Sequence, residues 1–420
     1  MEGTTSWASF TTRLKEIGKE VQVRHRDLRP EPIYHSLDFE THSDNEDCSN
    51  EETLLCIDSV LPDDLLERIL SFLPIASVFR AGTVCKRWRS ITLSEKFLWQ
   101  CSKMPAQKPW YFMFTNSEDP SGFAFDPVLK KWYNFSLPCI GTSSWFVASS
   151  FGLVCFMDNA NRNHVYVCNP ITRNRLRLPE PPEPRVSDYS ALAITVNKHT
   201  NTYIIVVARS KQVPHDYLQW NLSIDVYDSL DGVWNSSVSQ VLNGWRGGDE
   251  AVICNGILYC LIYSTAMSGN SENRHGLIIY DTSNALLQVL PISMPCSLTC
   301  GRLMNLKERL VMVGGIGRVD RPDIIKGIGI WELDKVEWRE ISRMPHRFFQ
   351  GFGEFDDVFS SSGTGDLIYI QSYGAPALLV FDMNQKSWRW SQKCPVTKRF
   401  PLQLFTGFCF EPRFEVAVSS

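Results

Sequence analysis

The clearest pattern of apolar and polar positions lies between residues 62 and 73. On a helical wheel of about 100° per residue, the apolar side chains fall within one arc of about 140° and the acidic and basic ones face away. The pattern predicts an amphipathic helix with Pro62 at its start and two aspartates in its first turn, and Pro74 predicts its end. The apolar positions are Leu65, Leu66, Ile69, Leu70 and Leu73.

A second apolar set follows at helical spacing. Val84, Trp88 and Ile91 recur at i, i+4 and i+7, which predicts another short helix. Some 45 residues in a few short helices are too few to bury this much apolar surface on their own. The segment therefore predicts a surface that needs a partner.

From Trp110 onward the pattern changes to short β-like runs that repeat. Each repeat holds an aliphatic or aromatic residue, an Asp or Asn, a turn, often a Trp, and then a Pro. We expect the Asp or Asn to form an Asx turn and the Trp to pack against the next unit. The marker recurs six times, about every 43 to 59 residues, at Asp126, Asn169, Asp228, Asp281, Asp334 and Asp382.

Six such units arranged radially cover each other's faces, which one four-stranded sheet cannot do. The repeat predicts a β-propeller over residues 105–420 with six blades, seven being the alternative count. A β-sandwich with chance spacing is the alternative fold. Strand-like runs at 404–410 and 414–418 lie beyond the sixth marker. Because open edges invite aggregation, we expect at least one of them to pair near residues 110–114 and close the ring.

Two of these patterns resemble known modules. Residues 57–101, with Leu61-Pro62-Asp63-Asp64-Leu65-Leu66 and Val84-Cys85-Lys86-Arg87-Trp88, resemble the F-box. The repeat and the pair Gly314-Gly315 resemble the kelch repeats of plant F-box proteins, although most copies lack the double glycine. The resemblance implies a small all-α F-box module followed by an all-β kelch-type propeller. The alternative for residues 57–101 is a helical hairpin that packs on its own chain.

An F-box implies binding to a Skp-type adaptor and, through it, to a cullin and a RING subunit. We expect the adaptor-binding module to be built from Leu61, Pro62, Leu65, Leu66, Ile69, Leu70, Leu73, Pro74, Val84, Cys85 and Trp88. Some of these side chains would face the module's own core and others the adaptor. The substrate would bind where connections from several blades converge around the central channel. Aromatic and arginine side chains near the innermost strands are the candidates: Trp145, Trp245, Arg246, Arg302, Arg347 and Phe352.

The predicted function is substrate recognition for a Skp–cullin–F-box ubiquitin ligase, in plant developmental regulation. The substrate would be an unidentified protein. A scaffold that binds a partner without degradation, and whose F-box controls its own turnover, is the alternative. We expect no catalysis and no cofactor, because the sequence has no paired histidines at zinc spacing and no glycine-rich loop followed by Lys-Ser/Thr before a helix.

Amino-acid composition limits the ligand classes and the cellular compartments that fit this chain. A net charge of −4 gives no case for nucleic-acid binding. The 13 cysteines are an odd number without paired C-x-x-C spacing, which indicates a reducing intracellular compartment, nucleus or cytoplasm. The sequence predicts no membrane span and no signal peptide. Residues 1–55 are acidic and aperiodic, which predicts a disordered tail, with a regulatory or partner-binding role as the alternative.

Overall fold

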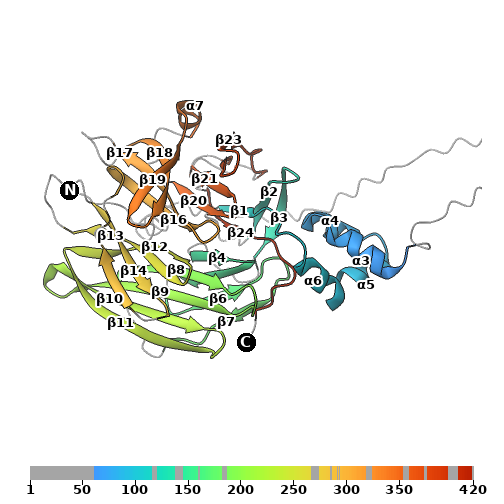
Figure 1. The fold of residues 1–420 in the computed structure, drawn as a ribbon, viewed down its shortest axis with the longest axis horizontal. Coiled ribbons are helices and arrows are strands. Elements are labelled where there is room, and N and C mark those ends of the chain that lie inside the picture. Colours follow the sequence, from blue (N-terminus) through green and yellow to red (C-terminus); the bar gives the residue numbers. More distant parts are fainter. Residues whose placement is uncertain are drawn as a thin grey trace, which may run out of the picture.

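A ring of β-sheets with a small group of helices at one side makes up the molecule (Figure 1). The computed structural model describes residues 61–115, 121–137, 145–158, 161–181, 187–265, 274–283, 286–290, 292, 294–317, 324–352, 359–372, 376–395 and 405–418. The predicted tail of residues 1–55 lies outside these ranges.

Four short helices form the module that precedes the sheets: α3 (Asp63–Ser71), α4 (Ile75–Ala81), α5 (Lys86–Thr92) and α6 (Glu95–Ser102). The first helix begins as predicted, with Pro62 as its N-cap, but it ends at Ser71, before Pro74, which is the N-cap of α4. The second predicted helix begins later than expected. Cys85 caps α5 by accepting the Trp88 N–H at Sγ, 3.4 Å away, so Val84 lies before the helix.

The described strands form six antiparallel four-stranded sheets, which confirms the six-bladed propeller. Blade 1 holds β24 (Phe405–Phe410), β1 (Trp110–Thr115), β2 (Ser121–Asp126) and β3 (Lys131–Ser136). Blade 2 holds β4 (Trp145–Ser150), β5 (Leu153–Asp158), β6 (Val165–Cys168) and β7 (Arg175–Arg177). Blade 3 holds β8 (Tyr189–Val196), β9 (Tyr203–Val213), β10 (Asp216–Asp228) and β11 (Val233–Asn243).

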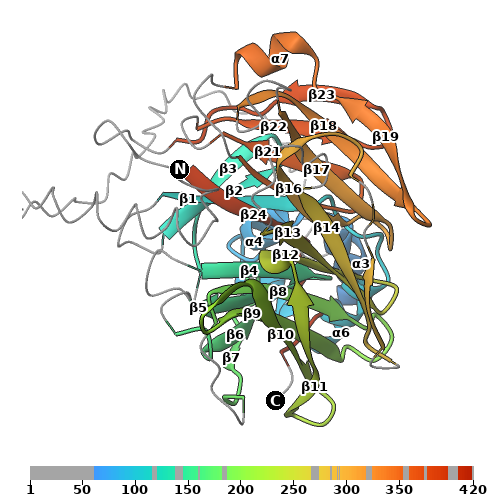
Figure 2. The same ribbon diagram turned by 90° about the vertical axis from the view of Figure 1, so that its left-hand side faces the viewer.

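The other three blades follow in chain order around the ring (Figure 2). Blade 4 holds β12 (Trp245–Cys254), β13 (Ile257–Ser264), β14 (His275–Asp281) and β15 (Leu286–Leu290). Blade 5 holds β16 (Leu298–Asn305), β17 (Leu310–Gly317), β18 (Ile325–Asp334) and β19 (Glu337–Arg343). Blade 6 holds β20 (Ser360–Thr364), β21 (Leu367–Gln371), β22 (Leu378–Asp382) and β23 (Ser387–Trp390), and the helix α7 (His346–Gln350) precedes it.

The last strand closes the ring. β24 is the first strand of the blade 1 sheet and pairs antiparallel with β1, from Trp110 opposite Phe410 to Thr115 opposite Phe405. This confirms the predicted closure. The run 414–418 is not a strand, contrary to its alternating pattern. It lies along blade 2 instead, where the Asn169 amide donates hydrogen bonds to the carbonyls of Arg413 and Val416, 3.0 and 2.7 Å away.

The repeated Asp and Asn residues form the predicted Asx turns. Carboxylate or amide oxygens accept backbone N–H groups two residues ahead in five of the six turns, at Asp126, Asn169, Asp228, Asp281 and Asp382. The tryptophans, however, pack in the opposite direction from the prediction. The indole N–H of Trp234 in blade 3 donates to the Pro179 carbonyl after blade 2, and Trp388 in blade 6 donates to Ser342 in blade 5. Each therefore binds the preceding blade.

The core of the propeller lies between its blades. Six apolar clusters of described residues occupy the six boundaries between neighbouring blades. A seventh cluster lies within the helical module. The ring is therefore held by face-to-face packing of sheets, with the inner strands left to line a channel.

The two faces of the ring differ in what they carry. The helical module packs where the inner strands end, because Ile75 and Ala76 share a cluster with Trp110 and Phe410, the paired ends of β1 and β24. Below, this side is the module face. The starts of the inner strands, including Tyr189 and Trp245, lie on the other side of the ring, the far face.

Candidate functional site

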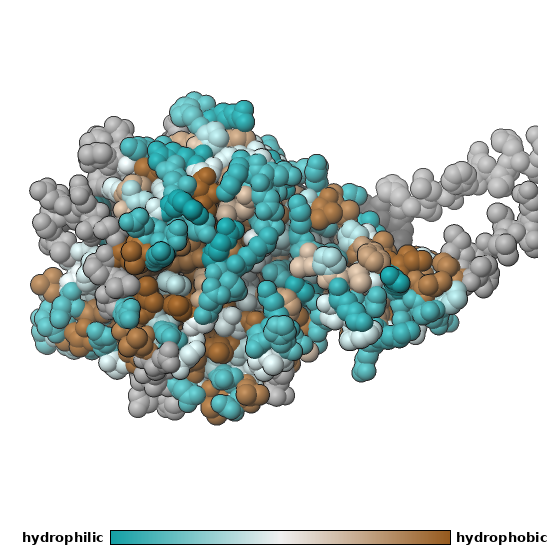
Figure 3. Space-filling model, viewed as in Figure 1, coloured by the Kyte–Doolittle hydropathy of each residue, from teal (hydrophilic) through white to brown (hydrophobic). Residues whose placement is uncertain are grey.

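Helix α3 exposes a stripe of apolar side chains. Leu65, Ile69 and Phe72 are spaced one helical turn apart, and their exposed fractions are 47%, 49% and 65%. Isolated exposed apolar residues are ordinary, but three that line one side of α3 and its C-cap form a contiguous apolar surface and a candidate binding site. Figure 3 shows apolar atoms on the outer part of the module, where Figure 1 places α3.

The other half of the same apolar arc faces inward. Leu66 and Leu70 are 2% and 1% exposed and pack with Val78, Ile91 and Phe97. Leu73 and Trp88 are partly buried against the same cluster. The structure thus divides the predicted adaptor-binding set: Leu66 and Leu70 belong to the module's core and cannot contact a partner directly.

The start of α3 is fixed by α5. The guanidinium of Arg87 lies 2.7 Å from the Asp63 carboxylate and also donates to the Leu61 carbonyl. Leu61 is half-buried and Pro62 is exposed, whereas Pro74 and Cys85 are partly buried. Val84 is 62% exposed just before α5. Val84 therefore adds exposed apolar surface to the module although its predicted helical position was wrong.

The module is joined firmly to the propeller. The Gln107 amide accepts the Ile75 N–H and donates to the Leu73 carbonyl, both at 3.0 Å. Phe414 packs against the module cluster, and its ring lies 5.4 Å from that of Phe79. These contacts fix where the exposed stripe points relative to the ring.

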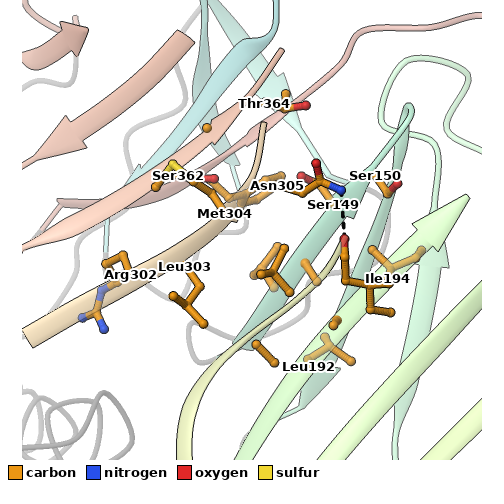
Figure 4. A pocket seen from close by; sticks show the side chains of 18 of the residues that line it. Ser149, Ser150, Leu192, Ile194, Arg302, Leu303, Met304, Asn305, Ser362 and Thr364 are labelled. Carbon is orange, nitrogen blue, oxygen red and sulfur yellow. Dashed lines mark hydrogen bonds between the residues drawn. The ribbon is translucent and has the colours of Figure 1, made fainter. Parts of the chain in front are cut away.

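The inner strands of all six blades line a central channel of about 240 Å³ (Figure 4). Its hydroxyl groups are used mostly to join neighbouring strands. Ser149 of β4 donates to the Cys409 carbonyl of β24, and Ser362 of β20 accepts the Cys409 N–H. Asn305 donates to the Ile253 carbonyl, 2.8 Å away. These polar groups of the channel lining therefore join the inner strands of neighbouring blades by hydrogen bonds.

A carboxylate and a guanidinium meet inside the channel. Arg302 of β16 lies 3.2 Å from Glu250 of β12 and also donates to the Phe359 carbonyl. Burial, and then the nearby Asp249, raise the pKa of Glu250 to about 7, although Arg302 acts in the opposite direction. Arg302 is 7% exposed. This predicted substrate residue is a cross-link between blades 4 and 5 that lines the channel.

The far face brings other predicted residues together with unpredicted ones. Trp245 and Arg246 begin β12, and the Arg246 guanidinium lies 4.1 Å from the Tyr189 ring centroid and 4.7 Å from that of Tyr263. Sequence reasoning missed both tyrosines and the nearby Arg162. No local signal could have found them, because they come from blades 2, 3 and 4 and meet only in the folded ring.

The remaining predicted substrate residues do not form one site with Arg246. Arg347 is exposed on α7, where its guanidinium lies 4.9 Å from the Phe348 ring. Phe352 is 3% exposed in the cluster between blades 5 and 6, so its side chain is part of the core and leaves little surface for a substrate. For Trp145 the described backbone begins β4, and its side chain lies outside the described part of the molecule.

Motifs that could carry chemistry have structural roles where they are described. Gly314 and Gly315 lie within β17, and a Cβ on Gly315 would come within 2.3 Å of Thr299 Oγ1, so close strand packing explains the pair. Within the described ranges no group of three His, Cys, Asp or Glu side chains could hold a metal ion. None of the described helices is long and apolar enough to cross a membrane.

Comparison with known proteins identifies both parts of the chain. Residues 58–103 match the family model described as F-box-like, and residues 128–305 match that of the F-box protein At3g26010-like β-propeller. The chain is 60% identical over 392 residues to the F-box/kelch-repeat protein At3g61590 of Arabidopsis thaliana, covering 90% of this chain and 95% of that protein. The chain belongs to the F-box/kelch-repeat family.

Two more distant relatives also match most of this chain. Protein UNUSUAL FLORAL ORGANS of Arabidopsis thaliana is 27% identical over 80% of this chain and 79% of its own length. SKP1-interacting partner 15 of the same plant is 25% identical over 84% of this chain and 96% of its own. The two family-model matches, with the six four-stranded sheets, confirm the predicted F-box and propeller architecture.

Proposed function

We propose that this F-box/kelch-repeat protein is the substrate receptor of a Skp–cullin–F-box ubiquitin ligase. The observation that carries the proposal is the stripe of Leu65, Ile69 and Phe72, which is apolar, ordered on one helix and exposed. The name of SKP1-interacting partner 15, a relative over most of the chain, supports a Skp-type adaptor as the occupant. The adaptor would connect the chain to the cullin and RING subunits.

The mechanism is tethering. The propeller holds a substrate protein, and the module fixes it to the ligase. Because contacts at Gln107 and Phe414 pack the module against the propeller, a substrate lysine would stay at high effective concentration near the charged conjugating enzyme. The chain itself supplies no reacting group in this scheme. A role in plant development is part of the proposal, supported by the name UNUSUAL FLORAL ORGANS of one relative.

Co-purification with a Skp-type adaptor tests the proposal. Leu65→Ser with Ile69→Ser should abolish it, since buried apolar anchors dominate interfaces and each costs about 2 kcal/mol or more when lost. Leu286→Ser is the matched control, because Leu286 is 54% exposed on β15 in the propeller. Adaptor binding that survives the double change, with the melting temperature intact, would refute the proposal. A bound partner whose degradation does not depend on an intact F-box, while the turnover of this chain does, would favour a scaffold instead.

A further inference from the structure

Arg246 is held between two aromatic rings on the far face. Tyr189 begins β8, whereas Tyr263 pairs directly with Arg246 across β12 and β13. Both rings lie against the guanidinium, at 4.1 and 4.7 Å from their centroids, and one of its N–H groups donates to the Gly247 carbonyl at 3.3 Å. Stacking of this kind orients the remaining donors for a planar, two-pronged acceptor.

A second arginine lies beside the same strand. Arg162, between β5 and β6, donates to the Ser187 carbonyl at 2.7 Å and to the Ser190 hydroxyl at 3.3 Å. Ser190 directly follows Tyr189 in β8. The Arg162 guanidinium also lies 5.6 Å from the Phe146 ring. Two guanidinium groups from different blades therefore flank the start of β8.

These two arginines differ from the buried arginines nearby. Arg209 pairs with Asp225, and Arg302 pairs with Glu250. Among the described residues, neither Arg162 nor Arg246 has a carboxylate within ion-pair distance. Both are only partly buried, so the positive charge is available to a ligand from solvent.

The surrounding charges select the kind of anion. His275 packs against the Tyr263 ring, and burial lowers its pKa to about 4, so it is neutral at physiological pH. Burial lowers the pKa of Arg162, and the nearby Asp188 and Asp249 act in the opposite direction. A group that carries two negative charges, such as a phosphate, would be repelled more strongly by these two aspartates than a carboxylate, which carries one. A singly charged carboxylate fits better than a phosphate.

We infer that Arg162 and Arg246 form the binding site for an acidic segment of the substrate protein, with Glu or Asp side chains. This inference rests on the proposed receptor function and names the chemistry of its substrate. The site lies on the far face, so a bound segment would not touch the module or compete with the adaptor. Tyr189 and Tyr263 act as positioning residues that hold the Arg246 fork.

Panning of degenerate peptide pools against the full chain bound to its adaptor tests the inference. Three pools carry a fixed central Glu-Glu, Gln-Gln or phosphoserine between random flanks. We expect retention of the Glu-Glu pool about tenfold above the Gln-Gln pool at low salt, which corresponds to ~1.4 kcal/mol. Because exposed charges are screened, the difference should shrink toward unity at about 1 M salt.

Variants then locate the contact. Arg246→Lys keeps the charge but loses the planar fork, and Arg162→Gln removes the second guanidinium; each should bring Glu-Glu retention close to that of Gln-Gln. Tyr189→Ala should weaken it partly. Arg339→Gln is the control, because Arg339 is 67% exposed on β19 and pairs weakly with Glu332. Melting temperature and adaptor co-purification of each variant report folding.

The outcomes separate this inference from the proposed function. Equal retention of the Glu-Glu and Gln-Gln pools by the wild-type complex overturns the acidic site while adaptor binding still stands. So does preference for the phosphoserine pool, or discrimination that survives both arginine changes. Failure of the wild-type chain to bind the adaptor overturns the receptor function instead.

Discussion

The Ser149 hydroxyl of β4 donates a hydrogen bond of 2.6 Å to the carbonyl of Cys409 in β24, at a sequence separation of 260 residues. The bond joins blade 2 to the strand that closes blade 1. With Ser362, which accepts the Cys409 N–H from the blade 6 side, it fixes β24 between its two neighbours. The inner strands are not backbone-paired across blades, so side chains supply these links.

Ser149→Ala should therefore weaken ring closure. Loss of one half-buried side-chain hydrogen bond costs about 1 kcal/mol, and more where the carbonyl is left without a partner. Urea denaturation followed by tryptophan fluorescence measures the change in the free energy of unfolding. Ser239→Ala on the exposed edge strand β11 is the control and should change it little. Equal effects of the two variants would show that the closure bond contributes nothing.

Removal of residues 403–420 should have a much larger effect. Without β24, β1 in blade 1 loses a neighbouring strand along its whole length, and the buried rings of Phe408 and Phe410 leave the cluster between blades 1 and 2. An exposed apolar edge promotes aggregation. We expect insoluble protein on expression, and a soluble truncation with a cooperative melting transition would contradict this.

The two halves of the α3 apolar arc should respond differently to truncation. Leu66→Ala removes a side chain that is 2% exposed and should cost about 2–5 kcal/mol of module stability. Leu65→Ala, at 47% exposed, should cost no more than about 0.5 kcal/mol but should weaken adaptor binding. Hydrogen exchange of module amides and adaptor affinity together give the comparison. Similar destabilisation by both changes would show that Leu65 is part of the core.

This division marks what could be predicted from the sequence. The wheel of residues 62–73 defined one apolar arc because helical periodicity is local. It could not separate Leu65 from Leu66, because the packing of α4, α5 and α6 decides which part of the arc is covered. The second helix was predicted to include Val84, but it begins two residues later, at Lys86. Its N-cap is Cys85, whose Sγ accepts the Trp88 N–H.

In the propeller, too, local features could be predicted from the sequence and contacts between distant segments could not. Asx turns and strand alternation depend on neighbours in sequence, so the six units were predictable from the spacing of their markers. The direction in which Trp234 and Trp388 pack depends on the handedness with which blades follow one another, and it was predicted in reverse. The cluster of Arg162, Tyr189 and Arg246 joins three blades, and no segment of sequence carries its pattern.

Trp388→Phe should loosen the boundary between blades 5 and 6. The substitution keeps the aromatic packing against Phe381, whose ring centroid is 4.7 Å away, but removes the indole N–H that reaches Ser342 at 3.1 Å. We expect a loss of about 1 kcal/mol in the free energy of unfolding. Ser342→Ala in the same background should then add little, because the two groups form one bond. Full additivity of the two changes would show that the bond is not made.

Glu250 should make stability depend on pH. The folded chain holds the pKa of this carboxyl at about 7, raised by burial from its ordinary value of 4.5. Between these values the unfolded chain loses a proton that the folded chain keeps, so the carboxyl favours folding at low pH and this contribution is lost as pH rises toward 7.

Glu250→Gln removes the titrating proton and keeps an oxygen that can accept from Arg302, 3.2 Å away. Thermal melting from about pH 5 to about pH 8 should therefore show a flatter decline for the variant than for the wild type. Parallel profiles would mean that Glu250 is ionised throughout this range and that Arg302, rather than burial, controls its charge.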